Sequence, residues 1–462
     1  GPNRIGQGLE FDTCCTLCSL TYKTLNKKTI IINSNPETVS TDYNSSDRLY
    51  IEALNSESVI EILKREKVKD VIIQLGGQTP LNIAEDLANA NFNIVGTSIE
   101  GIKASEDRST FKNAIESLNL NQARNSIASS KEEVFSIANT IGYPVLIRPS
   151  FVLGGRSMFI AYNSKSLIEF LEKEEVIISK EKPIIIDEFL EDAFEYDLDG
   201  VFDGNKLYIG GILQHIEAAG IHSGDSAAVF PPYKISEDHL LQMKEATYKL
   251  CKYFNIVGLV NLQFAIKNDK LYIIELNPRA SRTIPFISKY SQVNLIEVAT
   301  KVFSNIDLVQ QNLVDENSNY SCGTCTIGWA IKEAVFSFDR FKNIDPILGP
   351  EMRSTGETTG SGHTFGEAYA KSQISAGNKL PTKGKVLISV NKKDRNTIIP
   401  IARELQELGF SIAATRGTAR DLFDNDILCE VMLKTIDGSP NIVDNIRAKK
   451  IDLVINTPMG FH

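Results

Sequence analysis

The sequence lacks any apolar run that approaches the length of a membrane span, and no signal peptide is visible. It also lacks an excess of positive charge, because 49 Lys and Arg residues oppose 58 Asp and Glu residues and give a net charge of −9. Both signs are spread along the chain. These absences predict no membrane partner and no nucleic-acid partner.

Cysteine is scarce, with 7 residues in a chain of 462. This odd, sparse set favours a reducing compartment, so we expect a cytoplasmic protein. Two Cys-x-x-Cys pairs, at 15–18 and 322–325, could together form a split zinc site. The gap between the pairs is far longer than in ordinary zinc modules and no histidine lies near either pair, so buried or incidental thiols are the preferred interpretation.

The signatures of several enzyme classes are missing as well. The segment GPNRIGQG (residues 1–8) leads into a run with helical spacing, but it is neither G-x-G-x-x-G nor a P-loop. A glycine turn at the start of a helix can bind an anion, although this pattern alone is weakly specific. No Ser-His-Asp or Cys-His arrangement can be placed, so acyl-enzyme chemistry is not expected.

What the sequence does contain is a hairpin pattern between residues 256 and 286. Two runs that alternate apolar and polar residues flank a turn at 267–270. The expected apolar face consists of Val260, Leu262, Phe264, Ile266, Tyr272, Ile274 and Leu276. A slip of one residue would mix the two faces, so the faces specify the register.

Face matching predicts a three-residue loop for this hairpin. A two-residue loop would pair Gln263 with Ile274 and would mix a polar with an apolar residue. A three-residue loop pairs Phe264 with Ile274 and Gln263 with Glu275, and the faces then match.

The second face of the hairpin is polar. The same register places Asn261 opposite Asn277, beside the Gln263–Glu275 pair, and two arginines follow directly. Oxygen ligands for a hard cation beside guanidinium groups suit a metal-bound phosphate. The alternative is a hairpin face that is simply solvated.

Strands alternate with helices through the first hundred residues, which predicts a parallel, doubly wound sheet ending near Lys103. A second βα pattern starts at 385, where FSIAATRGTA predicts a strand, a glycine turn and a helix. Between them, the glycine-containing loop at 149–156 is either a flap over polyphosphate or an ordinary hairpin loop. The chain begins at Gly1 and stops after a strand, so we expect it to be cut at both ends.

Two of the five histidines, His215 and His222, lie in a polar, glycine-containing segment. A lone histidine is more often a hydrogen-bonded structural residue than a catalyst. The neighbouring Gly220, Ser223 and Asp225 would give this loop exposed backbone donors, as a ligand-facing loop has.

Long motifs follow one another in this order: GPNRIGQGLEFD, NSNPETVSTDYNSSDRLY, IIQLGGQTPLNIA, RPSFVLGGRSM, HIEAAGIHSGDSA, LVNLQFAIKNDKLYIIELNPRASRTIPFISK and GPEMRSTGE. Together they resemble the large subunit of the carbamoyl-phosphate synthetase family. They match its C-terminal half, the carbamoyl-phosphate synthetic component, and cover nearly the whole chain. The motifs NPETVSTDY and EMRSTGE are far more specific than a glycine pattern.

The resemblance implies a multidomain protein of the α/β and α+β classes. Its parts would be a Rossmann-like pre-ATP-grasp domain (1–103), an ATP-grasp domain (104–306), a C-terminal extension of the synthetic core with a linker (307–378), and an incomplete methylglyoxal-synthase-like α/β domain (379–462). The segment 320–327 looks like a local insertion relative to the family.

The resemblance also implies a reaction, the phosphorylation of carbamate by ATP to carbamoyl phosphate, which would feed pyrimidine and arginine biosynthesis. The implied cofactors are ATP with Mg²⁺ or Mn²⁺, and K⁺ as a further candidate. The implied partners are a bicarbonate-activating N-terminal half, fused or separate, and a glutaminase small subunit. Ornithine and a nucleotide are the implied effectors.

By motif position, the resemblance implies roles for individual residues. The divalent ions would be held by Gln263, Glu275 and Asn277. Arg279 and Arg282 would stabilise the carbamate and the transferring phosphoryl group, and Arg148, the third catalytic residue, would contact the phosphates. The nucleotide would be bound by Arg108, Arg148, Gly154, Gly155, Asp187, Glu188, Leu190, Glu195, Gly220, Ile221, His222, Ser223, Gln263 and Glu275. The effectors would be bound by Glu217, Asp225 and Glu333 (ornithine) and by Thr415 and Thr418 (nucleotide).

Two other functions stay open. A different ATP-grasp ligase, which joins a carboxylate to an amine or carboxylates biotin, would share the cation hairpin. A non-catalytic, effector-binding module of a synthetase complex would fit a chain that lacks the other half.

Overall fold

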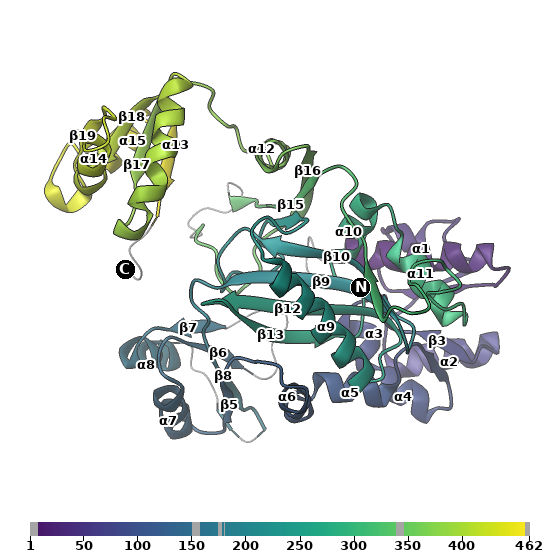
Figure 1. Cartoon of the computed structure of the whole chain (residues 1–462). Coiled ribbons are helices and arrows are strands. Elements are labelled where there is room, and N and C mark those ends of the chain that lie inside the picture. Colours follow the sequence, from purple (N-terminus) through teal and green to yellow (C-terminus); the bar gives the residue numbers. More distant parts are fainter. Residues whose placement is uncertain (1–7, 150–157, 174–177, 180, 339–345, 458–462) are drawn as a thin grey trace. The chain divides into compact units, whose positions relative to one another are not determined.

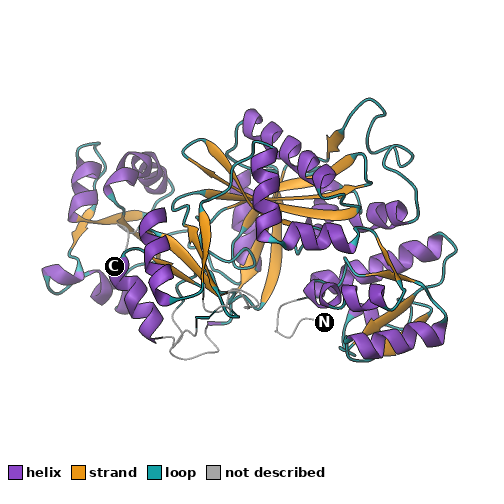
Figure 2. Ribbon diagram, turned by 90° about the horizontal axis from the view of Figure 1, so that it is seen from below, coloured by secondary structure: helices purple, strands orange, loops and turns teal. Residues whose placement is uncertain are grey.

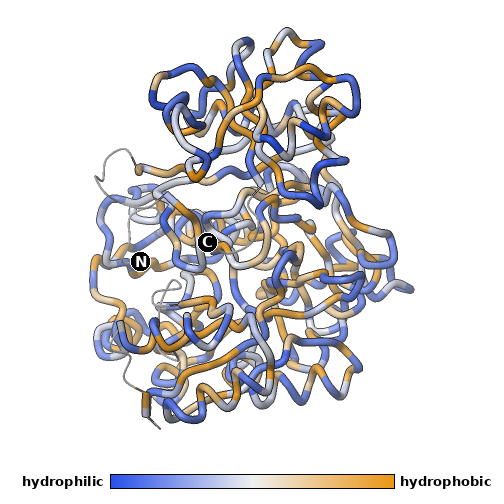
Figure 3. The backbone as a smooth tube through the Cα atoms, turned by 90° about the vertical axis from the view of Figure 1, so that its left-hand side faces the viewer, coloured by the Kyte–Doolittle hydropathy of each residue, from blue (hydrophilic) through white to orange (hydrophobic). Residues whose placement is uncertain are grey.

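The computed structural model describes residues 8–149, 158–173, 178–179, 181–338 and 346–457. The chain divides into two compact units, residues 1–377 and 378–462. Hydrophobic and hydrophilic stretches interleave along the backbone of both units (Figure 3). Within the described ranges, no helix combines the length and the apolar character that a membrane crossing requires.

An eight-stranded sheet forms the centre of the first unit (Figure 1). Its order is β13–β12–β9–β10–β11–β15–β16, with β14 beside β10. The strands are β9 (Phe194–Phe202), β10 (Leu207–His215), β11 (Ala228–Phe230), β12 (Gly258–Lys267), β13 (Lys270–Asn277), β14 (Tyr320–Cys322), β15 (Trp329–Val335) and β16 (Gly356–Gly362). The pairs β9–β10 and β12–β13 are antiparallel hairpins, and β12–β13 is the hairpin that alternation predicts.

Helices cover both faces of this sheet. On one face, α9 (Glu237–Tyr253) packs Met243 and Leu250 against Leu262 and Phe264. On the other face, α10 (Ile284–Ser291) and α11 (Leu295–Phe303) contact β9, β10 and β12. Helices therefore pack on both faces of the sheet. This packing holds the β12–β13 hairpin, with its polar residues, in place.

A smaller antiparallel sheet, ordered β5–β8–β6–β7, lies in the same unit (Figures 1 and 2). Its strands are β5 (Asn125–Ala128), β6 (Val145–Pro149), β7 (Phe159–Ala161) and β8 (Ile184–Glu188). Helices α7 (Lys131–Ile141) and α8 (Ser164–Lys173) add Val134 and Leu167 to its core. The short helix α6 (Arg108–Ser117) precedes this sheet and starts at Asp107, whose carboxylate accepts the Thr110 N–H.

The first hundred residues form helices around two pairs of parallel strands. β1 (Ile30–Asn33) pairs with β2 (Arg48–Ile51), and β3 (Asp70–Ile72) pairs with β4 (Asn93–Val95). The parallel direction is confirmed. The strands form two separate pairs and not the expected single sheet, because among the described residues no strand pairing joins β1 and β2 to β3 and β4. The helices are α1 (Leu9–Thr24), η1 (Val39–Thr41), α2 (Ser56–Glu66), α3 (Gln78–Asn82), α4 (Ala84–Asn89) and α5 (Ile99–Glu106).

This N-terminal part is hydrogen-bonded to the central sheet. Gln74 Nε2 donates to the Val257 carbonyl over 3.2 Å, and the Ala280 N–H donates to the Gln74 carbonyl over 2.8 Å. Thr97 Oγ1 also donates to the Val257 carbonyl, over 3.0 Å. These bonds attach the N-terminal part at the open end of the β12–β13 hairpin, opposite its turn.

The chain after α11 returns to the central sheet. β14 pairs in parallel with β10, with Tyr320 opposite Leu207, so the segment 320–327 begins as a strand of that sheet. β15 and β16 form an antiparallel pair, and α12 (Phe365–Ser375) packs against both.

The second unit contains a four-stranded parallel sheet in the order β19–β18–β17–β20. Its elements are β17 (Lys385–Ser389), η3 (Lys392–Asp394), α13 (Arg395–Glu407), β18 (Ser411–Thr415), α14 (Arg416–Phe423), β19 (Glu430–Met432), η4 (Thr435–Asp437), α15 (Ile442–Arg447) and β20 (Leu453–Asn456). The predicted glycine turn after β18 is wrong. Thr415 caps α14 directly, and Gly417 lies in the first turn of that helix.

Candidate active site

The β12–β13 hairpin contains the predicted polar pairs. Asn261 lies opposite Asn277, and Gln263 lies opposite Glu275. The turn has only two residues, however, at 268–269, and both have left-handed backbone with φ of 50° and 61°. This is the geometry of a tight hairpin turn, which Asn and Asp adopt readily.

A β-bulge reconciles the short turn with the matched polar pairs. The register shifts between Gln263 and Phe264, so that Phe264 lies opposite Ile273 and Ile274 is the extra residue. The predicted pair of Phe264 with Ile274 is therefore wrong. The alternation of apolar and polar residues does not reveal a bulge. Matching of the two faces therefore predicted a three-residue loop in place of the observed two-residue turn.

The bulge also changes which apolar side chains border the polar face. Leu271 and Ile273 pack into the core beneath α9, where Tyr272 and Ile274 were expected. Tyr272 and Ile274 instead join a separate apolar cluster that contains Leu190. The strand that carries Glu275 is thereby connected to the segment that follows β8.

Side-chain hydrogen bonds link the members of the polar face. Asn277 Nδ2 donates to Glu275 Oε1 over 2.8 Å and lies 3.4 Å from Asn261 Oδ1. The Glu275 side chain is exposed, whereas Asn261 is buried and donates to Asp199 Oδ1 over 3.0 Å. One carboxylate with neighbouring amide oxygens suits a hard cation that takes its remaining ligands from a phosphate.

Arg279 provides an anion-binding group beside this face. Its guanidinium donates to Asn277 Oδ1 over 3.2 Å and to the Ala280 carbonyl over 3.1 Å. Its buried Nε has no hydrogen-bond partner among the described residues, and burial lowers the pKa of Arg279. A buried donor without a partner costs free energy, which an anionic ligand would recover.

Two further arginines gather near the hairpin. Arg148 Nε donates to Asp187 Oδ2 over 2.7 Å. Burial opposes the charge on Arg148, but Asp187 and Glu275 outweigh it and raise the Arg148 pKa. Burial lowers the pKa of Arg108, and the nearby charge of Arg148 lowers it further. The charges of Asp187 and Glu275 act in the opposite direction. Side chains from α6, β6, β8 and β13 therefore interact electrostatically, and the two arginines bring positive charge close to Glu275.

The segment after β8 is approached closely by the loop at 220. Leu190 is buried, and Glu188 forms an ion pair with Arg124 at 2.9 Å. Gly220 has φ of +102°, and a Cβ there would lie 2.7 Å from the Phe189 ring. Only a glycine fits such a position without displacing the ring. The residues that follow, Ile221, His222 and Ser223, are half-buried.

His215 is buried between two carboxylates. Its Nε2 lies 2.7 Å from Asp197 Oδ2, and its Nδ1 lies 3.4 Å from Glu195 Oε2. Burial opposes a charged imidazole, but hydrogen bonding to Asp197 and Glu195 raises the His215 pKa to about 10. His215 therefore lies beside Glu195, which is the expected ribose ligand.

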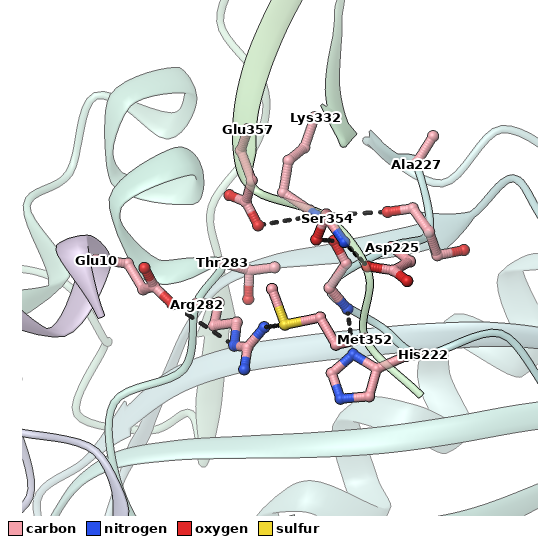
Figure 4. A network of polar contacts seen from close by, with 12 residues as sticks. Glu10, His222, Asp225, Ala227, Arg282, Thr283, Lys332, Met352, Ser354 and Glu357 are labelled. Carbon is pink, nitrogen blue, oxygen red and sulfur yellow. Dashed lines mark hydrogen bonds and ion pairs between the residues drawn. The ribbon is translucent and has the colours of Figure 1, made fainter. Parts of the chain in front are cut away.

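Asp225 ties a distant loop to the segment after His215 (Figure 4). It is 1% exposed, and its two carboxylate oxygens accept the N–H groups of Arg353, at 2.7 Å, and Ser354, at 2.9 Å. The same loop brings Met352 Sδ to 2.9 Å from the Arg282 guanidinium. The motif GPEMRSTGE is thereby placed over the arginine that follows β13.

Three charged groups of this region, Glu10, Lys332 and Glu357, were missed by sequence reasoning. Glu10 of α1 lies 3.5 Å from Arg282 Nε, and burial raises the Glu10 pKa. Lys332, 2% exposed, lies 3.4 Å from Glu357 (Figure 4). Pairing of β15 with β16 brings Lys332 close to Glu357, and the packing of α1 brings Glu10 close to Arg282, so no local pattern indicates these groups.

The expected effector carboxylates lie near one another. Glu217 Oε2 accepts the Ser226 hydroxyl at 2.8 Å and the Ala227 N–H at 2.7 Å. Burial, and then Glu217, raise the Glu333 pKa to about 7. Gln373 Nε2 donates to Glu333 Oε2 over 2.7 Å.

In the second unit, the two expected effector threonines are buried at the carboxyl end of the sheet. Thr415 Oγ1 lies 3.3 Å from Ser389 Oγ. Thr418 Oγ1 accepts the Val390 N–H at 3.3 Å and lies 3.4 Å from the Val390 carbonyl.

No zinc cluster is formed by the cysteines. All seven thiols are free, and in the described part of the chain no three His, Cys, Asp or Glu side chains are grouped to hold a metal. Burial raises the pKa of Cys15 to about 12 and that of Cys18 to about 11, as for unreactive thiols. The expected phosphate-flap residues Gly154 and Gly155 lie outside the described residues.

Family models match three parts of the chain. They are the carbamoyl phosphate synthase preATP-grasp domain at residues 1–104, the carbamoyl-phosphate synthase L chain ATP binding domain at 107–311, and the MGS-like domain at 397–462. A biotin carboxylase from Campylobacter jejuni, solved with a β,γ-ATP ligand, is similar in fold. That likeness has a TM-score of 0.58 and 19% identity, and it covers 71% of this chain and 74% of the carboxylase.

Two curated relatives cover the whole chain. The carbamoyl phosphate synthase large chain of Archaeoglobus fulgidus is 48% identical over 461 residues, and the chain spans only 42% of its length. The carbamoyl phosphate synthase large chain, C-terminal section, of Methanocaldococcus jannaschii is 47% identical over 469 residues, and the chain spans 76% of it. The chain therefore belongs to the carbamoyl-phosphate synthase large-chain family, whose ATP-binding domain is an ATP-grasp ligase domain.

Proposed function

We propose that this chain transfers the terminal phosphoryl group of ATP to carbamate and so forms carbamoyl phosphate and ADP. The observation that carries the proposal is the buried, unpartnered Nε of Arg279 beside Asn277 and Glu275, within the described residues. Oxygen ligands for a cation and a site for an anion then lie side by side. The names of the relatives from A. fulgidus and M. jannaschii agree with this reaction.

Phosphoryl transfer needs positioning and charge neutralisation more than a protein nucleophile. Arg108 and Arg148 would bind the phosphates of ATP from α6 and β6, and Arg279 and Arg282 would orient the carbamate. Because Arg279 is held by Asn277, the acceptor is positioned relative to the metal-binding end of β13.

The proposed ligands for Mg²⁺ or Mn²⁺ are Gln263, Glu275 and Asn277, with K⁺ as a further candidate ion. When bound, divalent ions held there would neutralise the charge that develops on the transferring group. The donor set fits, because it consists of oxygen atoms and because Glu275 is exposed.

The proposed nucleotide site continues along β8 and the segment after it. The apolar cluster of Leu190, Tyr272 and Ile274 would border the adenine ring. Glu195, which lies beside His215, would bind the ribose hydroxyls. Gly220 allows the loop that follows to approach the Phe189 ring, so the loop can close over a bound nucleotide.

As part of a larger synthetase, the chain would act with a bicarbonate-activating N-terminal half and a glutaminase subunit, in pyrimidine and arginine biosynthesis. Ornithine would bind near Glu217, Asp225 and Glu333, where a cation would meet clustered carboxylates. A nucleotide effector would bind near Thr415 and Thr418 of the second unit.

The test is the reverse reaction, because carbamoyl phosphate is more stable than carbamate. The chain, with ADP, Mg²⁺ and carbamoyl phosphate, is expected to form ATP, measured by a coupled luminescence assay. A folded chain that forms no ATP would contradict the proposal.

The second candidate is another ATP-grasp ligase, such as a biotin carboxylase. It is favoured only by the fold likeness to the C. jejuni enzyme. Acetyl phosphate and carbamoyl phosphate as alternative phosphoryl donors distinguish the two, because the proposed function requires carbamoyl phosphate to be the productive donor. A non-catalytic module would bind Mg·ATP poorly in calorimetry.

A further inference from the structure

Asp199 lies in a row of polar side chains that crosses three neighbouring strands. Register places Asp199 of β9 opposite Asn261 of β12, and Asn261 opposite Asn277 of β13. Asn261 Nδ2 donates to Asp199 Oδ1 over 3.0 Å, and Asn277 Nδ2 lies 3.4 Å from Asn261 Oδ1. The row therefore connects a core carboxylate to the proposed metal-binding end of β13.

The second oxygen of Asp199 reaches the loop that carries the arginines. Thr283 donates its hydroxyl to Asp199 Oδ2, and Ser281 Oγ lies 2.8 Å from Thr283 Oγ1. Ser281 and Thr283 directly flank Arg282 in the sequence. One carboxylate is thus hydrogen-bonded to both sides of the phosphate site.

A purely structural role would not require a carboxylate at this position. Asp199 is 0% exposed, and burial, followed by Asp197, raises its pKa to about 7. A buried carboxyl group is costly unless its oxygen atoms are hydrogen-bonded, and an apolar side chain of similar volume is often as stable. What an apolar side chain cannot do is accept hydrogen bonds from Asn261 and Thr283 together.

We propose that Asp199 is the positioning residue of the phosphate site, which fixes Asn277 through Asn261 and the arginine loop through Thr283. The metal-binding end of β13 and the acceptor-binding arginines then keep one relative placement. This proposal rests on the proposed function in one respect, the assignment of Asn277 as a metal ligand. A displacement of about 1 Å at such a site is enough to cost a large fraction of the rate.

The experiment compares Asp199→Ala, Asn261→Ala and Thr283→Val in the full 462-residue chain. Electron paramagnetic resonance measures Mn²⁺ binding in the presence of ADP, calorimetry measures ADP binding without metal, and the reverse reaction measures turnover. The control is Asp12→Ala, which removes another buried carboxylate that ties a loop, through the Thr38 hydroxyl and the Ser40 N–H.

The hydrogen bonds of Asp199 to Asn261 and to Thr283 predict different losses of function. Asp199→Ala is expected to weaken Mn²⁺ binding about tenfold or more and to lower kcat, with metal-free ADP binding changed less than about threefold. Asn261→Ala should reproduce the loss of metal binding. Thr283→Val should keep metal binding and raise KM for carbamoyl phosphate or lower kcat. Asp12→Ala should leave Mn²⁺ binding within about twofold.

The proposal is overturned if folded Asp199→Ala binds Mn²⁺ and turns over as the unaltered chain does. An equal loss of metal binding in Asp12→Ala also overturns it, because the effect would then be general destabilisation. If Asp199→Ala does not fold, the other two variants decide, and unchanged metal binding in Asn261→Ala with unchanged turnover in Thr283→Val overturns it. An unaltered chain that binds Mn·ADP but forms no ATP contradicts the proposed reaction alone, and the metal-binding comparison still tests Asp199.

Discussion

The Arg148 guanidinium donates to the Asp187 carboxylate across 2.7 Å and so joins β6, which precedes the expected phosphate flap, to β8, which leads into the proposed nucleotide-binding segment. The two side chains are 29% and 14% exposed. Removing one partner of a largely buried pair leaves the other charge poorly compensated. The pair therefore connects the phosphate end of the proposed site with its adenine end.

Asp187→Asn is expected to lower the free energy of unfolding by about 1–2 kcal/mol and to weaken Mg·ATP binding, because Arg148 loses its counter-charge. Urea denaturation and calorimetry measure the two effects. Glu85→Gln is the control outside the proposed site, because Glu85 and its partner Lys103 are 58% and 57% exposed and such pairs contribute about 0–1 kcal/mol. Equal losses in both variants would show that the Arg148–Asp187 pair has no special role.

Glu275→Ala is expected to reduce metal-dependent ATP formation at least about a hundredfold and to leave the fold intact, because Glu275 is the exposed carboxylate of the proposed metal site. The reverse reaction at several Mg²⁺ concentrations measures the loss, and circular dichroism checks the fold. Glu297→Ala, which changes a half-buried glutamate of α11 paired with Lys301, is the control and should retain full activity. Unchanged turnover in Glu275→Ala would refute this metal site.

Gly220→Ala is expected to weaken nucleotide binding, because the new Cβ would lie 2.7 Å from the Phe189 ring and would displace the loop. Gly142→Ala separates this collision from backbone strain, because Gly142 also has positive φ, of +88°, but its Cβ would meet nothing within 4 Å. Both variants should lose about 1 kcal/mol of stability from backbone strain. Calorimetry with Mg·ATP should show a loss of affinity only for Gly220→Ala, and equal affinities would contradict the proposed approach of this loop to the nucleotide.

His215→Gln is expected to change how stability depends on pH. The His215 pKa is raised to about 10, so its charged form stabilises the folded state fully below its ordinary pKa of 6.5, and this stabilisation is lost as pH rises through about 10. The difference in unfolding free energy between the unaltered chain and His215→Gln should therefore shrink above pH 6.5, by at most about 1.4 kcal/mol per pH unit.

Urea denaturation at several pH values between 6 and 10 measures this difference. The control is His363→Gln, which changes an exposed histidine. A constant difference for His215→Gln would mean that the imidazole between Asp197 and Glu195 is not held in its charged form.

The sequence by itself determined the family, the order of the elements and the polar pairs of the hairpin. Alternation of apolar and polar residues is a local property, so the pairing of Asn261 with Asn277 and of Gln263 with Glu275 follows from the sequence. The same alternation could not reveal the bulge at Ile274, because a single inserted residue changes the register without changing the composition.

Only the tertiary structure decided which distant groups meet. Asp225 and Ser354 are 129 residues apart in the sequence and hydrogen-bonded in the fold, and Asp199 and Thr283 are separated by 84 residues. Such contacts depend on which strands pair and on which helices cover the sheet, so no local periodicity encodes them. The sequence thus identified the polar face of β12 and β13, and packing supplied the buried carboxylates that hold that face in position.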